Sequence, residues 1–200
     1  MSPYRILIVE DETNLLKQLK KLIIKEGFIV DIAENGKKAL EKWENNIYDL
    51  VLLDLAMPKM NGREVLNRIK SKQPLTQIVI ISGQGGKDDL IDAINKHVYK
   101  YIEKINEKEQ LFNDIKMSVK SALENRHPLL LSLESMIEKG ENETFLLSGE
   151  ETFTPKKLYD EVRKGTDFGK QFCKDFEKSI KEFTPIEESI DDLLGIKGVV

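Results

Sequence analysis

The sequence DLVLLDLAMPKMNG, residues 49–62, decides how this chain is expected to fold. Residues 50–55 are apolar except for Asp54, which is typical of a strand buried on both faces of a parallel sheet. A carboxylate at such a place is costly unless it is solvated or paired. Asp54 is therefore the first candidate for a functional residue.

Four more short apolar runs lie on either side of this one and alternate with stretches of helical spacing. They cover residues 6–9, 28–32, 78–81 and 98–102. A fifth helical stretch begins near Asn106. Five strand–helix repeats predict an α/β fold of the flavodoxin-like class, with a five-stranded parallel sheet that is doubly wound, so that helices cover both faces.

Local signals predict where the helices begin and end. Thr13 is the predicted N-cap of the first helix, and Gly27 is its stop. Asn35-Gly36 precedes the second helix and Gly62 the third. The fourth helical pattern carries apolar residues at positions 90–94.

Polar residues follow three of the five runs, namely Glu10 and Asp11, Ser82, and Lys104, and Asp54 lies near the end of the run at 50–55. The carboxyl ends of the strands share one sheet edge, where open α/β sheets bind ligands. Converging carboxylates need a cation, and oxygen ligands suit Mg²⁺. A carboxylate can accept a phosphoryl group, which a lysine and a hydroxyl can then stabilise. Each residue alone could be a turn or surface residue, so the prediction of phosphoryl transfer to Asp54 rests on all of them together.

These segments resemble the receiver domain of two-component response regulators, from about Tyr4 to Asn125. The matching pieces are RILIVEDE at 5–12, DLVLLDLAMPKMNG at 49–62, IVIISG at 78–83 and YIEK at 101–104. The resemblance implies a phosphoacceptor domain that uses Mg²⁺ as its cofactor.

The resemblance also implies a role for each metal-site residue. Asp54 matches the phosphoacceptor and contributes to the metal site. Asp11 matches a direct Mg²⁺ ligand, and Glu10 matches an acidic residue that acts through water. Ala56 would lend its backbone carbonyl to the metal.

Three further residues match the phosphate-sensing switch of the family. Ser82 matches the switch hydroxyl and Lys104 the phosphate-sensing lysine. Tyr101 matches the aromatic residue that turns inward when the hydroxyl engages the phosphoryl group. The chain departs from the family at Ile105, where proline is usual, and at His97-Val98, where small residues are usual.

Residues 126–200 are expected to form a separate small module, mainly helical, after a receiver at residues 1–125. His127-Pro128 indicates a break or kink and then a helix ending at Gly140. ETFLLSGEETFTP predicts a β-hairpin with Ser148-Gly149 at its turn. A further helix is predicted between Thr154-Pro155 and Gly165.

The last part of this module carries an aromatic stripe at helical spacing. Thr166 is the predicted cap of the helix that bears it, and the stripe consists of Phe168, Phe172, Phe176, Ile180 and Phe183. Such a stripe is more typical of a core than of a ligand site. A short final helix is expected at 186–194.

Charge and composition restrict the partners. The chain has 200 residues and a net charge of −4, and residues 126–200 carry 11 Lys and Arg against 16 Asp and Glu. This acidity argues against a DNA-binding module. One cysteine, Cys173, no signal-peptide pattern and no apolar run of about 20 residues predict a cytoplasmic protein without a membrane partner.

The sequence therefore predicts a response regulator that signals through phosphorylation-dependent protein–protein interaction. Its expected partners are a sensor histidine kinase or phosphotransfer protein and a downstream protein target, and a homodimer is left open. The alternative is a transcription regulator with an atypical DNA-binding C-terminus. We do not expect an enzyme, because residues 126–200 contain no recognised catalytic motif.

Overall fold

The structure is a computed structural model that describes residues 4–57, 62–83, 97–104, 107–141, 143, 146–148 and 151–183. The chain divides into two compact units, Met1–Glu124 and Asn125–Val200. Each unit is considered separately below.

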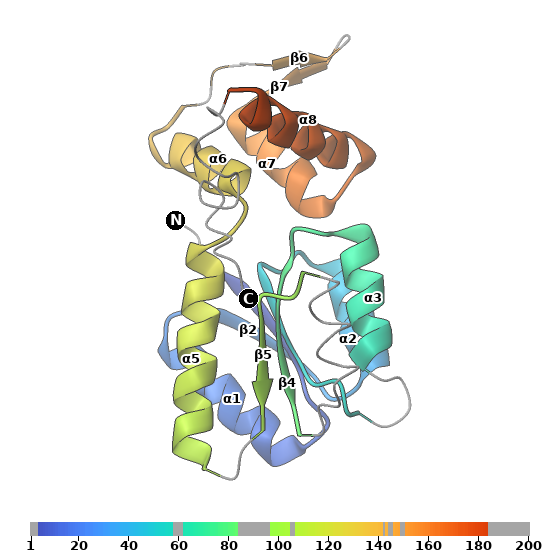
Figure 1. Cartoon of the computed structure of the whole chain (residues 1–200), viewed down its shortest axis with the longest axis vertical. Coiled ribbons are helices and arrows are strands. Elements are labelled where there is room, and N and C mark those ends of the chain that lie inside the picture. The colour runs from blue at the N-terminus through green and yellow to red at the C-terminus, as the bar shows by residue number, and fades with distance from the viewer. Residues whose placement is uncertain are drawn as a thin grey trace. The chain divides into compact units, whose positions relative to one another are not determined.

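The first unit contains a parallel five-stranded sheet (Figure 1). Its strands are β1 (Arg5–Val9), β2 (Ile29–Ala33), β3 (Leu50–Leu53), β4 (Gln77–Ser82) and β5 (Lys100–Glu103), in the order β2-β1-β3-β4-β5. Every residue of β3, the central strand, is fully buried. The predicted five-stranded parallel sheet is confirmed.

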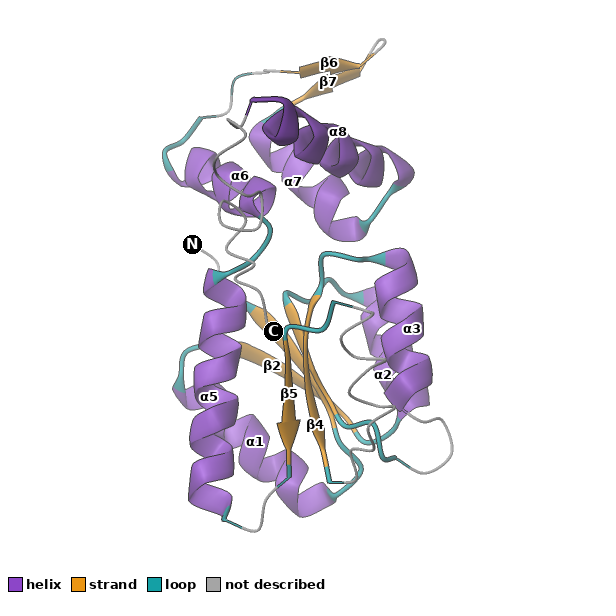
Figure 2. Ribbon diagram, viewed as in Figure 1, coloured by secondary structure: helices purple, strands orange, loops and turns teal. Residues whose placement is uncertain are grey.

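Helices cover both faces of this sheet (Figure 2). The described ones are α1 (Thr13–Lys25), α2 (Gly36–Asn45), α3 (Gly62–Lys72) and α5 (Lys108–Glu124). One apolar cluster joins the sheet to α2 and α3, and a second joins it to α1 and α5. The doubly wound arrangement is confirmed, and the fourth predicted helical pattern, at 90–94, lies outside the described residues.

The two faces explain the unbroken apolar pattern of the strands. In β1, Leu7 and Val9 belong to the cluster beneath α2 and α3, whereas Ile6 and Ile8 belong to the cluster beneath α1 and α5. Because successive strand residues point to opposite faces, a sheet covered on both sides needs apolar residues at every position.

One predicted helix cap is wrong. Thr13 is already the first helical residue, and Glu12 occupies the N-cap without a side-chain hydrogen bond. The turn before α1 is closed instead by the Glu10 carboxylate, which accepts the Glu12 backbone N–H at 3.2 Å. Two other signals are confirmed, since Asn35 caps α2 and Gly27 ends α1 with φ +89°. Gly62, predicted to precede the third helix, is the first residue of α3.

The second unit contains α6 (Pro128–Glu138), the antiparallel hairpin of β6 (Leu146–Ser148) and β7 (Glu151–Phe153), α7 (Pro155–Lys164) and α8 (Asp167–Phe183). The predicted helical module with a hairpin agrees with these elements. Ser148 pairs with Glu151 and so belongs to a strand, whereas the prediction placed it in the turn. Gly149 and the predicted final helix at 186–194 lie outside the described residues.

Most helix ends in the second unit follow the predicted signals. Thr154 accepts the Lys157 N–H at 3.2 Å and caps α7, and Gly165 ends that helix with φ +64°. Thr166 Oγ1 accepts the Gly169 N–H at 3.1 Å and caps α8. Gly140, with φ +76°, follows α6. His127 and Pro128 mark a break and a new helix, so that α5 does not run on as a kinked one.

The predicted assignment of the aromatic stripe to the core is only partly right. Phe168, Phe172 and Phe176 are half-buried, whereas Gly169 and Cys173 are the buried residues of α8 among those described. Helix α7 approaches along the glycine, where an added Cβ would lie 2.3 Å from the Glu161 backbone oxygen. The stripe therefore lies at the edge of the core, where Phe168 stacks on Phe153 with ring centroids 4.2 Å apart.

A buried polar network joins Arg126, which precedes α6, to Glu134 of α6 and Tyr159 of α7. Both ends of the Arg126 guanidinium donate to the Glu134 carboxylate, one of them at 2.8 Å to Oε1. The Tyr159 hydroxyl donates to the same carboxylate. All three residues are less than 10% exposed, at 3%, 7% and 8%.

Within the described part of the chain, no helix is long and apolar enough to span a bilayer.

Candidate functional site

Three carboxylates gather where β1 and β3 end. Glu10 and Asp11 follow β1, Asp54 follows β3, and one oxygen from each lies within 4.8 Å of the others. Glu10 is 1% exposed and Asp54 3% exposed, whereas Asp11 is more open to solvent. Parallel strands with adjacent carboxyl ends produce this convergence, as the sequence predicted.

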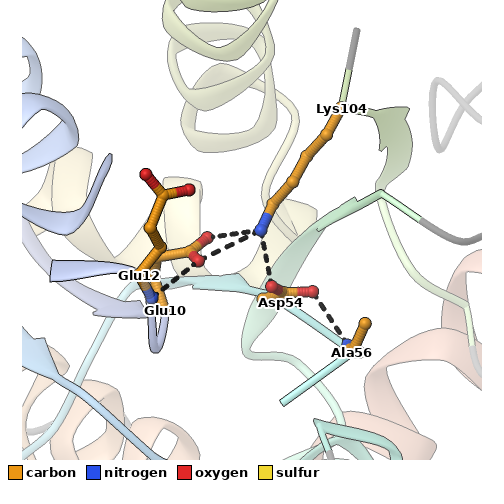
Figure 3. Close-up of polar contacts among 5 residues, drawn as sticks. All are labelled: Glu10, Glu12, Asp54, Ala56 and Lys104. Atoms are coloured by element: carbon orange, nitrogen blue, oxygen red, sulfur yellow. Dashed lines mark hydrogen bonds and ion pairs between the residues drawn. The ribbon is translucent and has the colours of Figure 1, made fainter. Parts of the chain in front are cut away.

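Lys104 places a positive charge between two of these carboxylates (Figure 3). Its Nζ lies 2.6 Å from Asp54 Oδ2 and 2.9 Å from Glu10 Oε2. The Lys104 backbone N–H donates to the Ser82 carbonyl at 2.9 Å, so the end of β5 is held against the end of β4. The partners are 50 and 94 residues away in the sequence, and only the fold brings them together.

The Asp54 carboxylate is fixed at both oxygens. Oδ2 accepts from Lys104, and Oδ1 accepts the Ala56 backbone N–H at 2.8 Å (Figure 3). Its own backbone N–H donates to the Val9 carbonyl at 2.9 Å. The family resemblance implied a role for Ala56 only through its carbonyl, so the hydrogen bond from its N–H to Asp54 was not predicted.

Burial and pairing act on the charges of the site. Burial raises the pKa of the Glu10 carboxyl above its usual value, and Lys104 only partly offsets that effect. Burial also disfavours the charged form of Lys104, but hydrogen bonds to Asp54 and Glu10 outweigh it and raise the pKa of Lys104. The lysine is therefore held as a cation at neutral pH.

Ser82, the last residue of β4, provides a hydroxyl without a described partner. The residue is fully buried, and its Oγ has no hydrogen-bond partner among the residues that the structure describes. Buried polar atoms are nearly always paired, so such a hydroxyl needs an explanation, and an incoming ligand is one.

A family comparison agrees with this geometry. The model of the response regulator receiver domain matches residues 6–116, which is more than half of the chain. The chain belongs to the response regulator receiver domain family. The first unit is called the receiver domain from here on.

Individual relatives match the receiver domain at similar levels. Response regulator ArlR of Staphylococcus haemolyticus is 38% identical over 111 residues, which is 56% of this chain and 50% of ArlR. Chemotaxis protein CheY of Bacillus subtilis is 37% identical over 102 residues, 50% of this chain and 85% of CheY. Transcriptional regulatory protein DltR of Streptococcus agalactiae is 30% identical over 118 residues, 59% of this chain and 53% of DltR. The chain thus spans about half the length of ArlR and DltR.

A solved structure of similar fold carries a ligand. Response regulator protein TrrA of Thermotoga maritima, crystallised in complex with Mg²⁺-BeF, is 32% identical with a TM-score of 0.50. The alignment covers 57% of this chain and 98% of TrrA.

The receiver domain places the remaining predicted residues as follows. Tyr101 lies on β5 opposite Ile80 of β4, and its ring packs half-buried against the core beneath α2 and α3. Ser82 ends the neighbouring strand. Ile105 lies outside the described residues. The switch roles of Ser82 and Tyr101 stay predictions.

Proposed function

We propose that this protein is a response regulator whose receiver domain is phosphorylated on Asp54 in the presence of Mg²⁺. The observation that carries the proposal is the setting of Asp54, a 3% exposed carboxylate that contacts Lys104 at 2.6 Å and lies within 4.8 Å of two more carboxylates. Such a carboxylate is poorly placed for stability alone, because among the described residues Lys104 is paired with two carboxylates and a third lies close to them.

The donor set fits Mg²⁺. Glu10, Asp11 and Asp54 supply carboxylate oxygens, and the Ala56 carbonyl would add a neutral one. The Mg²⁺-BeF complex of TrrA supports the same ligand class for a related fold. Bound Mg²⁺ would neutralise the carboxylates and the phosphoryl oxygens together, which reduces the repulsion between them.

The side chains then divide the phosphoryl transfer between them. An Asp54 oxygen attacks phosphorus, the bond from phosphorus to the donor nitrogen of a phosphohistidine breaks, and its electron pair stays on that nitrogen. Lys104 exchanges its contact with Asp54 for one with a phosphoryl oxygen. The Ser82 hydroxyl, buried and without a described partner, donates a hydrogen bond to another. In this proposal Tyr101 follows Ser82 and reports the change on the β5 surface.

The proposed phosphodonor is a sensor histidine kinase or phosphotransfer protein of the cytoplasm. The proposed output is binding of a downstream protein rather than catalysis or DNA binding, because residues 126–200 are acidic. DltR is named a transcriptional regulatory protein, but its match covers only 118 residues, so that name does not extend to the second unit.

Phosphorylation of Asp54 can be tested with matched aspartate variants. Asp54→Asn should abolish labelling by acetyl phosphate and Mg²⁺, measured as the mass of one phosphoryl group on the intact chain. Asp49→Asn is the control, since Asp49 is also nearly buried, at 8% exposure, but lies at the other end of β3 and accepts the Arg5 N–H. Equal labelling of wild type and Asp54→Asn would exclude Asp54 as the acceptor.

The output can be tested by capture of partners from a lysate, with and without acetyl phosphate. Wild type should gain or lose a bound protein on phosphorylation, and Asp54→Asn should behave as the unphosphorylated form under both conditions. If the bound proteins of the two chains stay alike throughout, the proposed switch is wrong.

A further inference from the structure

Gly62, the first residue of α3, touches the backbone of the phosphoacceptor. A Cβ added at Gly62 would lie 2.0 Å from the Asp54 carbonyl oxygen and 2.7 Å from the Leu55 Cα. The Gly62 N–H also donates to the Leu55 carbonyl at 3.2 Å. The start of α3 therefore lies directly against Asp54, the residue that follows β3.

The need for glycine here comes from contact and not from backbone conformation. The described glycines with positive φ are Gly27, Gly140 and Gly165, so Gly62 has a φ that any residue can adopt. Gly27 is the opposite case, because its φ is +89° and an added Cβ would meet nothing within 4 Å. Gly62 and Gly27 therefore separate the steric requirement for glycine from the conformational one.

If a side chain were added at Gly62, the segment after β3 is the part of the backbone that would move. Helix α3 is held in the core by Val65, Leu66 and Ile69, each at most 1% exposed. The β3 strand is bonded to β1 on one side and β4 on the other. A methyl group at Gly62 would therefore displace the segment after the strand, which carries Asp54 and Ala56.

We propose that Gly62 is a positioning residue for phosphoryl transfer, and this inference rests on the proposed function. By admitting the Asp54 carbonyl, it sets where the Asp54 carboxylate lies between Lys104 Nζ at 2.6 Å and the Ala56 N–H at 2.8 Å. A shift of the backbone changes both distances at once. Misplacement of a reacting group by about 1 Å can slow a reaction by about 100-fold.

Gly62→Ala and Gly27→Ala form the test pair in the full-length chain. Gly62→Ala should slow labelling by acetyl phosphate about 10- to 100-fold per folded molecule and weaken Mg²⁺ binding in calorimetry. It should also move the NMR signal of the Ala56 amide, because that N–H bonds to Asp54 Oδ1. Gly27→Ala should lower stability while leaving the labelling rate, the Mg²⁺ affinity and the Ala56 signal as in wild type.

A second, stabilising substitution allows for the possibility that Gly62→Ala unfolds the protein. If Gly62→Ala is too unstable, the same measurements are made with His97→Gly present, because His97 has φ +50° and glycine removes the strain of a side chain there. Rates are divided by the folded fraction from a urea titration. Wild-type labelling and an unmoved Ala56 signal in the folded variant would overturn the positioning role. If wild type itself is never labelled, the proposed function fails, and the Ala56 signal without Mg²⁺ or phosphodonor still decides the role of Gly62.

Discussion

The two units bury charged groups in different ways. In the second unit, the Arg126 guanidinium makes two hydrogen bonds to the Glu134 carboxylate, and Tyr159 adds a third to the same carboxylate. In the receiver domain, Lys104 is shared between Glu10 and Asp54, and a third carboxylate lies within 4.8 Å. Among these described residues, the first arrangement sets one positive charge against one carboxylate, and the second sets one positive charge against three carboxylates.

This difference distinguishes a buried ion pair that serves the fold from a carboxylate cluster that can bind a ligand. A balanced buried pair satisfies its own charges and needs no ligand. A buried cluster with more negative than positive charge destabilises the protein when no ligand is bound. Proteins keep such clusters mainly at functional sites, where a cation or a reacting group can neutralise the excess charge. The Ser82 hydroxyl is a further buried polar group of the receiver domain without a described partner.

Acid-to-amide substitutions give the largest contrast between the units. Glu134→Gln should destabilise the second unit by about 3–5 kcal/mol, because the buried Arg126 guanidinium loses its ion pair with Glu134. The measurement is urea unfolding of the full-length chain, followed by hydrogen exchange of the amides in α6 and α7. The control is Arg126→Met with Glu134→Leu, which removes both charges and should restore most of the loss.

Asp54→Asn is the matched change in the receiver domain. It should alter stability by no more than about 1 kcal/mol in either direction. Lys104 keeps Glu10 as a partner at 2.9 Å, and the repulsion between the carboxylates decreases. A loss as large as that of Glu134→Gln would show that the receiver site is held together by its charges and would remove the contrast.

The same contrast decides what could be predicted from the sequence. Glu10, Asp11, Asp54, Ser82 and Lys104 were found because strand ends in a parallel sheet share one edge, so positions in sequence gave positions in space. The caps at Asn35, Thr154 and Thr166 were found because capping is local.

Features that depend on packing were missed or misplaced. Arg126 and Tyr159 are 33 positions apart in the numbering and both bind Glu134, so no spacing pattern indicated the network. Thr13 satisfies the local rule for a cap, yet the Glu10 carboxylate closes that turn from outside the helix. The aromatic stripe had the right period, but the close approach of α7 at Gly169 shifted the buried face of α8 away from it.

The pH dependence should differ between the units through His127. Its Nδ1 accepts the Leu129 N–H at 3.3 Å and caps α6, its Nε2 lies 3.3 Å from Glu177, and its ring lies beside Phe176. Burial lowers the pKa of His127 below its usual 6.5, and Glu177 only partly offsets this. The unfolded chain therefore binds the proton more tightly, so the contribution to stability is full above pH 6.5 and decreases as the pH falls below it.

Unfolding of the second unit in urea between pH 5 and pH 8 tests this sign. One proton limits the slope to about 1.4 kcal/mol per pH unit. His127→Asn keeps a capping side chain and should remove the slope, whereas substitution of His97, the other histidine, which is exposed, should not. Stability that instead increases toward pH 5 through His127 would mean that the pairing with Glu177 dominates.

The smallest expected effect concerns His97 of the receiver domain, which has a left-handed backbone conformation. In the described part of the second unit, this conformation occurs only at glycines. Among the described residues, the left-handed positions are Gly27, Gly140, Gly165 and His97, the last with φ +50°. A side chain in this region is strained by about 1–2 kcal/mol, and glycine recovers that strain but loses chain entropy, so His97→Gly should stabilise the receiver domain by about 0.5–1 kcal/mol in urea unfolding. Gly140→Ala is the reverse change in the second unit, at φ +76° with no atom within 4 Å of the added Cβ, and should destabilise by a similar amount. If His97→Gly does not raise the free energy of unfolding while Gly140→Ala lowers it, the exposed His97 side chain must itself stabilise the receiver domain by about as much as its backbone strain costs. The two units would then differ in how they use left-handed backbone positions as well as in how they bury charge.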